Sequence, residues 1–283
     1  MTVAGLALAA ACASGSGYTA PAPPAAVPAR DSAPPRAVSA PSTIRLGPSA
    51  LRYVVARHIH RSFSGQSLDI ALHVYLGALI VGPADTAGYP TTITVDSVTA
   101  DSGTFLPPAF NLAGARGLRF TGHLAASGDF RDAVASDTVV AANLSTLIGN
   151  FRDFFPRVPA GGLAPDAKWT DTTSVTDQGA GSSVTVTSLN HTSVGRWADR
   201  DGTRCLELDV QSTFTLSGNG QQNGQNFTLA GSGVRNGVDY VSVDGRYVGG
   251  TAGDSTSYTV SLQALGQVVP VVQTTQTTIV VIR

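Results

Sequence analysis

Apolar and polar residues alternate along much of this chain, most clearly in residues 204–216. The even positions of that stretch are mainly large and apolar, namely Leu206, Leu208, Val210, Phe214 and Leu216. The odd positions are mainly polar, namely Cys205, Glu207, Asp209, Gln211 and Thr213. A period of two with one apolar face is typical of an antiparallel sheet that has one face in water.

The same kind of pattern extends from Trp169 to the end of the chain. It predicts strands at 182–189, 192–198, 204–216, 225–234, 239–248, 257–265 and 268–282. Turn signals separate them at 178–181, 199–202, Asn219-Gly220, Asn236-Gly237 and Asp244-Gly245. This part of the chain is therefore expected to be almost entirely strand.

The earlier part of the chain predicts strands at 51–63, 68–82, 91–99 and 118–125, with a loop over 101–117. In the third of these strands, Ile93, Val95 and Ser97 are expected on one face. The two parts, about 49–160 and 161–283, look alike in plan, which suggests a duplication that no residue-by-residue alignment supports.

One helix is predicted, over about 137–155, because apolar residues recur there at spacings of three and four. The apolar set is Val140, Leu144, Leu147, Ile148, Phe151 and Phe154. Ser136 or Asp137 would cap its start and Pro156 would end it. The expected fold is mainly β (α+β): a curved antiparallel sheet or incomplete barrel with this helix packed in its hollow.

The first twelve residues predict an export signal. A short apolar run, 5–11, ends in small residues before Cys12, and it falls short of the roughly 20 residues that a membrane span needs. Residues 8–12 resemble the bacterial lipobox, so we expect Cys12 to be lipidated. No Lys or Arg precedes Arg30, which suggests a true start upstream of Met1. Plain secretion, with Cys12 incidental, and an unprocessed chain are the alternatives.

Residues 13–48 are rich in Pro, Ala and Ser and are expected to form a disordered tether, because they offer little to bury. Residues 49–283 then form a single β-rich domain in two halves. The formal net charge of −1 gives no basic field and argues against nucleic acid as a partner. With Cys12 lipidated, Cys205 would be a lone thiol; a disulfide between the two is the alternative.

Catalytic and metal motifs are absent from the sequence, which contains no GxSxG, HExxH or P-loop. Residues 218–224 are glycine-rich, but we interpret them as a hairpin loop. His58, His60 and His73 could supply metal nitrogens if they shared a face, although simple surface histidines fit better. Residues 199–202 are interpreted as a turn, not a calcium loop. Nothing in the spacing brings Asp69, Asp96 and Asp101 together.

The segment Phe154-Phe155-Pro156, followed by Lys168-Trp169, resembles a pattern in uncharacterised bacterial envelope lipoproteins with two β-rich halves around a central helix. The resemblance covers about residues 50–283 in outline and departs at Ala167-Lys168, where Gly-Asp or Gly-Glu is common. More loosely, the plan is similar to half-barrel lipoprotein carriers and lipid-binding lipoproteins. The resemblance implies an apolar ligand but transfers no site residue.

Together these features predict an exported bacterial lipoprotein, held at the outer membrane or cell surface by its lipid, or else secreted or periplasmic. We expect a non-catalytic structural or interaction protein of the envelope, with its hollow packed shut. The alternative is a carrier or sensor of a lipid or other hydrophobic ligand, and a hydrolase is a third hypothesis. No cofactor or metal is expected, and neither the ligand-binding residues nor a protein partner can be named.

Overall fold

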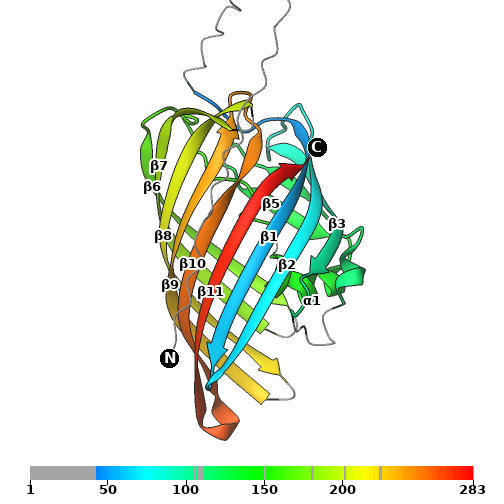
Figure 1. The fold of residues 1–283 in the computed structure, drawn as a ribbon, viewed down its shortest axis with the longest axis vertical. Coiled ribbons are helices and arrows are strands. Elements are labelled where there is room, and N and C mark those ends of the chain that lie inside the picture. The colour runs from blue at the N-terminus through cyan, green and yellow to red at the C-terminus, as the bar shows by residue number, and fades with distance from the viewer. Residues whose placement is uncertain are drawn as a thin grey trace, which may run out of the picture. The chain divides into compact units, whose positions relative to one another are not determined.

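The computed structural model describes residues 43–104, 106, 111–149, 151–179, 182–200, 202–222 and 225–282. Their strands form one eleven-stranded antiparallel sheet (Figure 1). The strands are β1 (Ser49–Phe63), β2 (Gln66–Ile80), β3 (Tyr89–Ala100), β4 (Arg119–Leu124), β5 (Phe130–Ala135), β6 (Lys168–Gly179), β7 (Ser182–Arg200), β8 (Thr203–Gln222), β9 (Gln225–Ser242), β10 (Tyr247–Leu262) and β11 (Gln267–Ile282). The helices are η1 (Leu112–Ala115), α1 (Thr138–Ile148) and η2 (Gln263–Leu265).

The strand order is β5-β4-β3-β2-β1-β11-β10-β9-β8-β7-β6. The first and last strands therefore pair at the centre of the sheet, from Arg52 opposite Ile282 to Phe63 opposite Val271. The sheet curves but does not close into a barrel, because β5 and β6 end it as two separate edges (Figure 1). The central β1–β11 pairing makes the two predicted halves one continuous sheet.

Side chains on the concave face of β1–β4 make most of the core. Tyr53, Leu76, Ile93 and Val95 are almost completely buried there. The concave face of β6–β10 differs, because most of its side chains remain partly exposed in a regular alternation. The core therefore fills one side of the curved sheet and leaves a hollow on the other.

Helix α1 is shorter than the predicted 137–155. Asp137 caps it as predicted, since its carboxylate accepts hydrogen bonds from the backbone N–H groups of Val139 and Val140. The helix ends at Gly149, where φ is 77°, and not at Pro156. Phe151 and Phe154 lie beyond this end, so their helical spacing was misleading.

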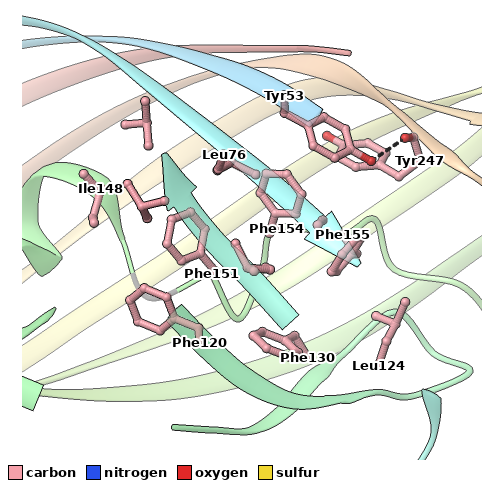
Figure 2. Packing of buried hydrophobic residues seen from close by; sticks show 14 of the residues in the cluster. Tyr53, Leu76, Phe120, Leu124, Phe130, Ile148, Phe151, Phe154, Phe155 and Tyr247 are labelled. Atoms are coloured by element: carbon pink, nitrogen blue, oxygen red, sulfur yellow. Dashed lines mark hydrogen bonds between the residues drawn. The ribbon is translucent and has the colours of Figure 1, made fainter. Parts of the chain in front are cut away.

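The segment after α1 fills the core in place of a longer helix. We call Phe151, Phe154, Phe155 and Val158 the aromatic plug; all four are buried. Figure 2 shows the ring of Phe154 among those of Phe151, Phe155, Tyr53 and Tyr247. The centroids of Phe154 and Tyr53 are 5.2 Å apart in an edge-to-face arrangement, a favoured geometry for aromatic pairs.

Hydrogen bonds and charge hold the aromatic plug against the β4–β5 turn. The backbone N–H of Val158 donates to the carbonyl of Ser127 at 2.9 Å. The Arg157 guanidinium pairs with the Asp129 carboxylate. Burial raises the pKa of Asp129, but the hydrogen bond from Ser127 and the interactions with Arg157 and Arg131 outweigh burial, so the pKa is lowered overall. The plug is thus fixed at its C-terminal end by a turn that precedes the helix.

Several strand predictions were wrong in detail. Strand β5 was not predicted, and Asn219-Gly220 and Asn236-Gly237 lie inside β8 and β9 instead of in turns. A register shift between Tyr75 and Leu76 places Val98, and not Ser97, in the core. Asp244-Gly245 is the real turn between β9 and β10.

No helix in the described part of the chain combines the length and apolar character needed to cross a membrane.

Candidate ligand-binding hollow

A cavity of about 480 Å³ lies on the concave face of β6–β11. The aromatic plug segment borders it through Phe155, Pro156 and Arg157, and β1 contributes Arg57. Its volume falls in the usual range for small-molecule sites, roughly 300–1,000 Å³. The space that the aromatic plug leaves free is therefore large enough for a small-molecule ligand.

Cross-strand register places apolar side chains at one end of the cavity. Leu216 on β8 faces Gly231 on β9, which faces Tyr258 on β10. The next row runs from Phe214 through Gly233 to Thr256. Valines of β6 and β7 continue this wall: Val175, Val184 and Val186.

The glycines in these rows allow Phe214 and Tyr258 to lie close to β9. A Cβ at Gly233 would overlap the ring of Phe214, and one at Gly231 would overlap the side chain of Tyr258. The Phe214 ring therefore lies close to the surface of β9 at Gly233, and the Cβ of Tyr258 approaches β9 as closely at Gly231. The apolar end of the hollow depends on residues without side chains.

Charged side chains surround the middle of the cavity. Arg235 on β9 faces Asp254 on β10, and the neighbouring row contains Gly237 and Ala252. Asp239 follows Gly237 on the same face of β9. The last member, Arg57, faces Thr277 of β11, in the row that also contains Ala252. We call the space above Gly237 and Ala252, with these four charged residues around it, the charged niche.

The two acids of the charged niche hold protons more tightly than usual. Burial raises the pKa of Asp239, and a 2.8 Å hydrogen bond from the Tyr247 hydroxyl and the charge of Arg235 offset only part of this. Burial also raises the pKa of Asp254 against the charges of Arg235 and Arg57 and a hydrogen bond from Thr275. For both carboxylates, the hydrogen bonds and nearby positive charges do not fully offset the cost of burying the ionised form.

The cost of burying the charge of Arg57 is not fully offset either. Burial lowers the pKa of its guanidinium despite the charge of Asp254. Its Nη1 donates to the carbonyl of Leu147 at 3.0 Å, while its buried Nε has no hydrogen-bond partner among the residues that the structure describes. Among the described residues, no direct ion pair joins any two of the four charged side chains in the niche. Buried charges that lack a direct counter-charge are costly, so this arrangement is one that a ligand would stabilise.

Asp239→Asn should make the protein more stable at neutral pH. A raised pKa in the folded state means that the folded state binds the proton more tightly, so the parent loses stability as pH rises from the ordinary aspartate value through the raised pKa. Urea unfolding between pH 4 and 8 should show the variant's advantage at high pH and its disappearance at low pH.

Asp244→Asn is the matched control with the opposite sign. Burial raises the pKa of Asp244, but hydrogen bonds from Ser242 and Arg246 outweigh it and lower the value overall. This variant should be less stable than the parent at neutral pH and should converge with it as pH falls. The same sign for both variants would contradict the assignment of Asp239.

The histidines considered as metal ligands lie on the convex face. His58 Nε2 and His60 Nδ1 are 3.7 and 2.7 Å from the same oxygen of Asp69, whereas His73 is 3.2 Å from Asp101. The structure therefore separates His73 from the other two. No group of three or more His, Cys, Asp or Glu side chains suited to a metal ion occurs in the described ranges.

The three aspartates singled out in the sequence are also kept apart. Asp69 contacts His60, Asp101 lies beside His73, and Asp96 pairs with Arg52 at 2.9 Å. They form no carboxylate pair. The segment 199–202 joins β7 to β8, as a turn should, although Asp201 lies outside the described residues.

One arrangement on the convex face has the geometry of a catalytic relay. Ser62 Oγ is 3.3 Å from His60 Nε2, and His60 Nδ1 is 2.7 Å from Asp69. Acyl transfer also needs N–H donors aimed at the developing oxyanion. Strand β1 is paired on both sides at Ser62, so its backbone groups are committed to the sheet. We interpret this relay as a surface hydrogen-bond network.

The cysteines divide between the described and undescribed parts of the chain. Cys12 lies outside the described residues, so its lipidation stays a prediction. Cys205 is a buried free thiol that donates to the carbonyl of Thr203 at 3.3 Å. Burial raises its pKa, which keeps the thiol protonated and unreactive. Most of the glycine-rich segment belongs to β8, and its tip at 223–224 is also outside the described residues.

Sequence reasoning missed all four residues of the charged niche. A signal was available in β9, where Arg235 and Asp239 occupy the same alternation as Phe227, Leu229 and Val241. A charge at an apolar position of a strand points to an unusual environment. The meeting of Arg57 with Asp254 had no local signal, because it depends on the β1–β11 pairing.

No protein-family model matches the chain, and no curated protein is similar to it. Among solved structures, Pseudomonas aeruginosa OccK2 (OpdF) is similar at a TM-score of 0.26 and 9% sequence identity, over 83% of this chain and 98% of that chain. This likeness is too low to carry an argument about fold or function.

Proposed function

We propose that this protein is a non-catalytic binding protein that holds a small amphipathic ligand in the hollow of its sheet. The observation that carries the proposal is a cavity of about 480 Å³ with an apolar end at Phe214, Leu216 and Tyr258 and a ring of charges beside it. Ligand sites are typically hollows lined by apolar side chains with a few placed polar groups, and this lining has that character.

The ligand we propose is amphipathic and not a bare acyl chain. An acyl chain would cover the apolar wall but supply no opposite charge to Arg57, Arg235, Asp239 and Asp254 in a site from which it had excluded water. A ligand with a polar head and an apolar tail serves both regions. The combined apolar and charged lining therefore favours a carrier or sensor of an amphipathic ligand over a scaffold whose hollow is packed shut.

We infer the location of the protein from its predicted N-terminal export signal. The predicted tether, 13–48, is too long at its C-terminal end, because Ile44 and Leu46 are buried in the core and Ile44 bridges to Leu163. Cys12 would carry lipid and anchor the chain to a bacterial membrane, and the part of the tether before residue 43 would let the domain stand away from it. The ligand would then be met outside the cytoplasm. Neither a cofactor nor nucleic acid enters this function.

The test uses the full chain, made in bacteria with its own leader. Native mass spectrometry would look for a co-purified small molecule, and anilinonaphthalene sulfonate, an aromatic amphipathic anion, would serve as a fluorescent probe. We expect saturable probe binding that Ala252→Phe abolishes by filling the charged niche.

Thr278→Phe is the matched control, because Thr278 is exposed on the convex face of β11. It should bind the probe as the parent does, and both variants should unfold cooperatively. No bound molecule together with probe binding that Ala252→Phe leaves unchanged would overturn the proposal.

A further inference from the structure

We propose that the charged niche recognises a zwitterionic head group, so that the ligand is an amphiphile carrying one cation and one anion close together. This inference rests on the proposed function and specifies the ligand class of the same site. It follows from the order of the charges around Gly237 and Ala252.

The signs alternate around the niche. Arg235 and Asp239 lie on the same face of β9, on either side of Gly237. Asp254 is the cross-strand partner of Arg235, and Arg57 closes the ring from β1, beyond Thr277. Going around, the order is Arg235, Asp239, Arg57 and Asp254, so that each cation lies between two anions.

A ligand with a single charge fits this ring poorly. An anion that approaches Arg57 and Arg235 is also brought towards Asp239 and Asp254, and a cation at the acids is brought towards the arginines. In a partly dried site each like-charge contact costs several times what it would in water. A zwitterion can place its anion by the arginines and its cation by the acids at once.

A free donor and a carboxylate without an ion pair match this head group. The buried Nε of Arg57 has no hydrogen-bond partner and can donate to a carboxylate or phosphate oxygen. Asp254 makes no direct ion pair within the described ranges and can accept from an ammonium group. Small residues at the centre, Gly237 and Ala252, leave the room that a head group needs.

The rows of the sheet also give the direction of the tail. Next to the row of Arg235 and Asp254 come the rows of Phe214 and Thr256 and then of Leu216 and Tyr258. The row of Asp239 lies on the other side of the niche, toward buried Leu208. A bound amphiphile would therefore keep its head at the niche and extend its tail over Phe214 toward Leu216 and Tyr258.

The experiment compares four probes that share a dodecyl tail and differ in their heads. They are dodecylphosphocholine, laurate, dodecylammonium and dodecyl maltoside, each titrated into the full chain below its micelle concentration. The zwitterion should bind about 10- to 100-fold more tightly than the other three, the range expected for one hydrogen bond to a charged group.

Two variants should then change the preference in opposite directions. Arg235→Gln removes a cation and should shift the preference toward dodecylammonium, whereas Asp254→Asn should shift it toward laurate. Arg52→Gln and Asp96→Asn change an exposed ion pair, 2.9 Å apart, between β1 and β3, and they should leave the order of the four probes unchanged.

The outcomes separate this inference from the proposed function. Equal binding of all four heads, or tightest binding of a singly charged or neutral one, overturns the zwitterion and leaves an amphipathic site. A change in the affinity order of the four probes in the Arg52 or Asp96 variant also overturns the inference, because the charged niche would then not determine which head group binds. Binding of none of the four probes overturns both proposals.

Discussion

Phe154→Ala should lower the free energy of unfolding by about 3–5 kcal/mol, the usual cost of truncating a buried phenylalanine. Phe154 is 7% exposed, and its ring contacts those of Tyr53, Phe151, Phe155 and Tyr247. Alanine would leave a cavity at the centre of the aromatic plug and remove four ring contacts at once. Urea unfolding followed by tryptophan fluorescence would measure the loss.

Val139→Ala is the matched control for this prediction. Val139 is 69% exposed on α1, so its truncation removes an apolar side chain without opening a cavity. The change in stability should be within about 0.5 kcal/mol. A loss at Phe154 no larger than that at Val139 would mean that the aromatic plug does not hold the concave core together.

The strands of this fold could be predicted from the sequence because their signal is local. The alternation in β8 correctly placed Leu206, Leu208 and Val210 on one face, and these side chains do face the concave side. When one face of a sheet is covered, apolar residues at every second position can be buried only if they all point to that face, and this fixes the register of the strand. The antiparallel arrangement followed from the short turns between strands.

The extent of the helix could not be predicted in the same way. Phe151 and Phe154 have helical spacing with Leu144 and Leu147, but Gly149 ends the helix before them. Phe151 then takes a φ of 60°, which a non-glycine residue rarely adopts. The packing of the aromatic plug against Tyr53 and Tyr247 outweighs this local preference, and such packing is invisible in a local pattern.

The Asn-Gly pairs were misread for a related reason. Asn236-Gly237 has the composition of a two-residue hairpin turn. In the structure, β9 continues through it, because β8 and β10 pair with β9 on both sides of this position. Gly237 serves instead to leave open space on the concave face.

The candidate site was hidden for a topological reason. Arg57 and Asp254 lie near opposite ends of the chain and meet only because β1 pairs with β11 and β11 with β10. A sequence can show that Arg235 occupies an apolar alternation, but not which charges surround it. The cavity itself arises because the aromatic plug fills only part of the curve of the sheet.

Gly128→Ala should lower the free energy of unfolding by about 2–5 kcal/mol, which combines left-handed backbone strain with overpacking. Gly128 has a φ of 84°, and a Cβ there would overlap the carbonyl oxygen of Pro156. The backbone of the aromatic plug segment would have to move, although Val158 is hydrogen-bonded to Ser127 beside it. Urea unfolding at neutral pH would measure the loss.

Gly117→Ala separates the two contributions. Gly117 has a φ of 81° but no atom lies within 4 Å of the position of its Cβ, so only the backbone strain applies. Its cost should be about 1–2 kcal/mol. A larger loss at Gly128 than at Gly117 measures how tightly the β4–β5 turn holds the plug. Equal losses would show that Pro156 moves freely, and the wall that Phe155 and Pro156 give to the ligand hollow would then be adjustable.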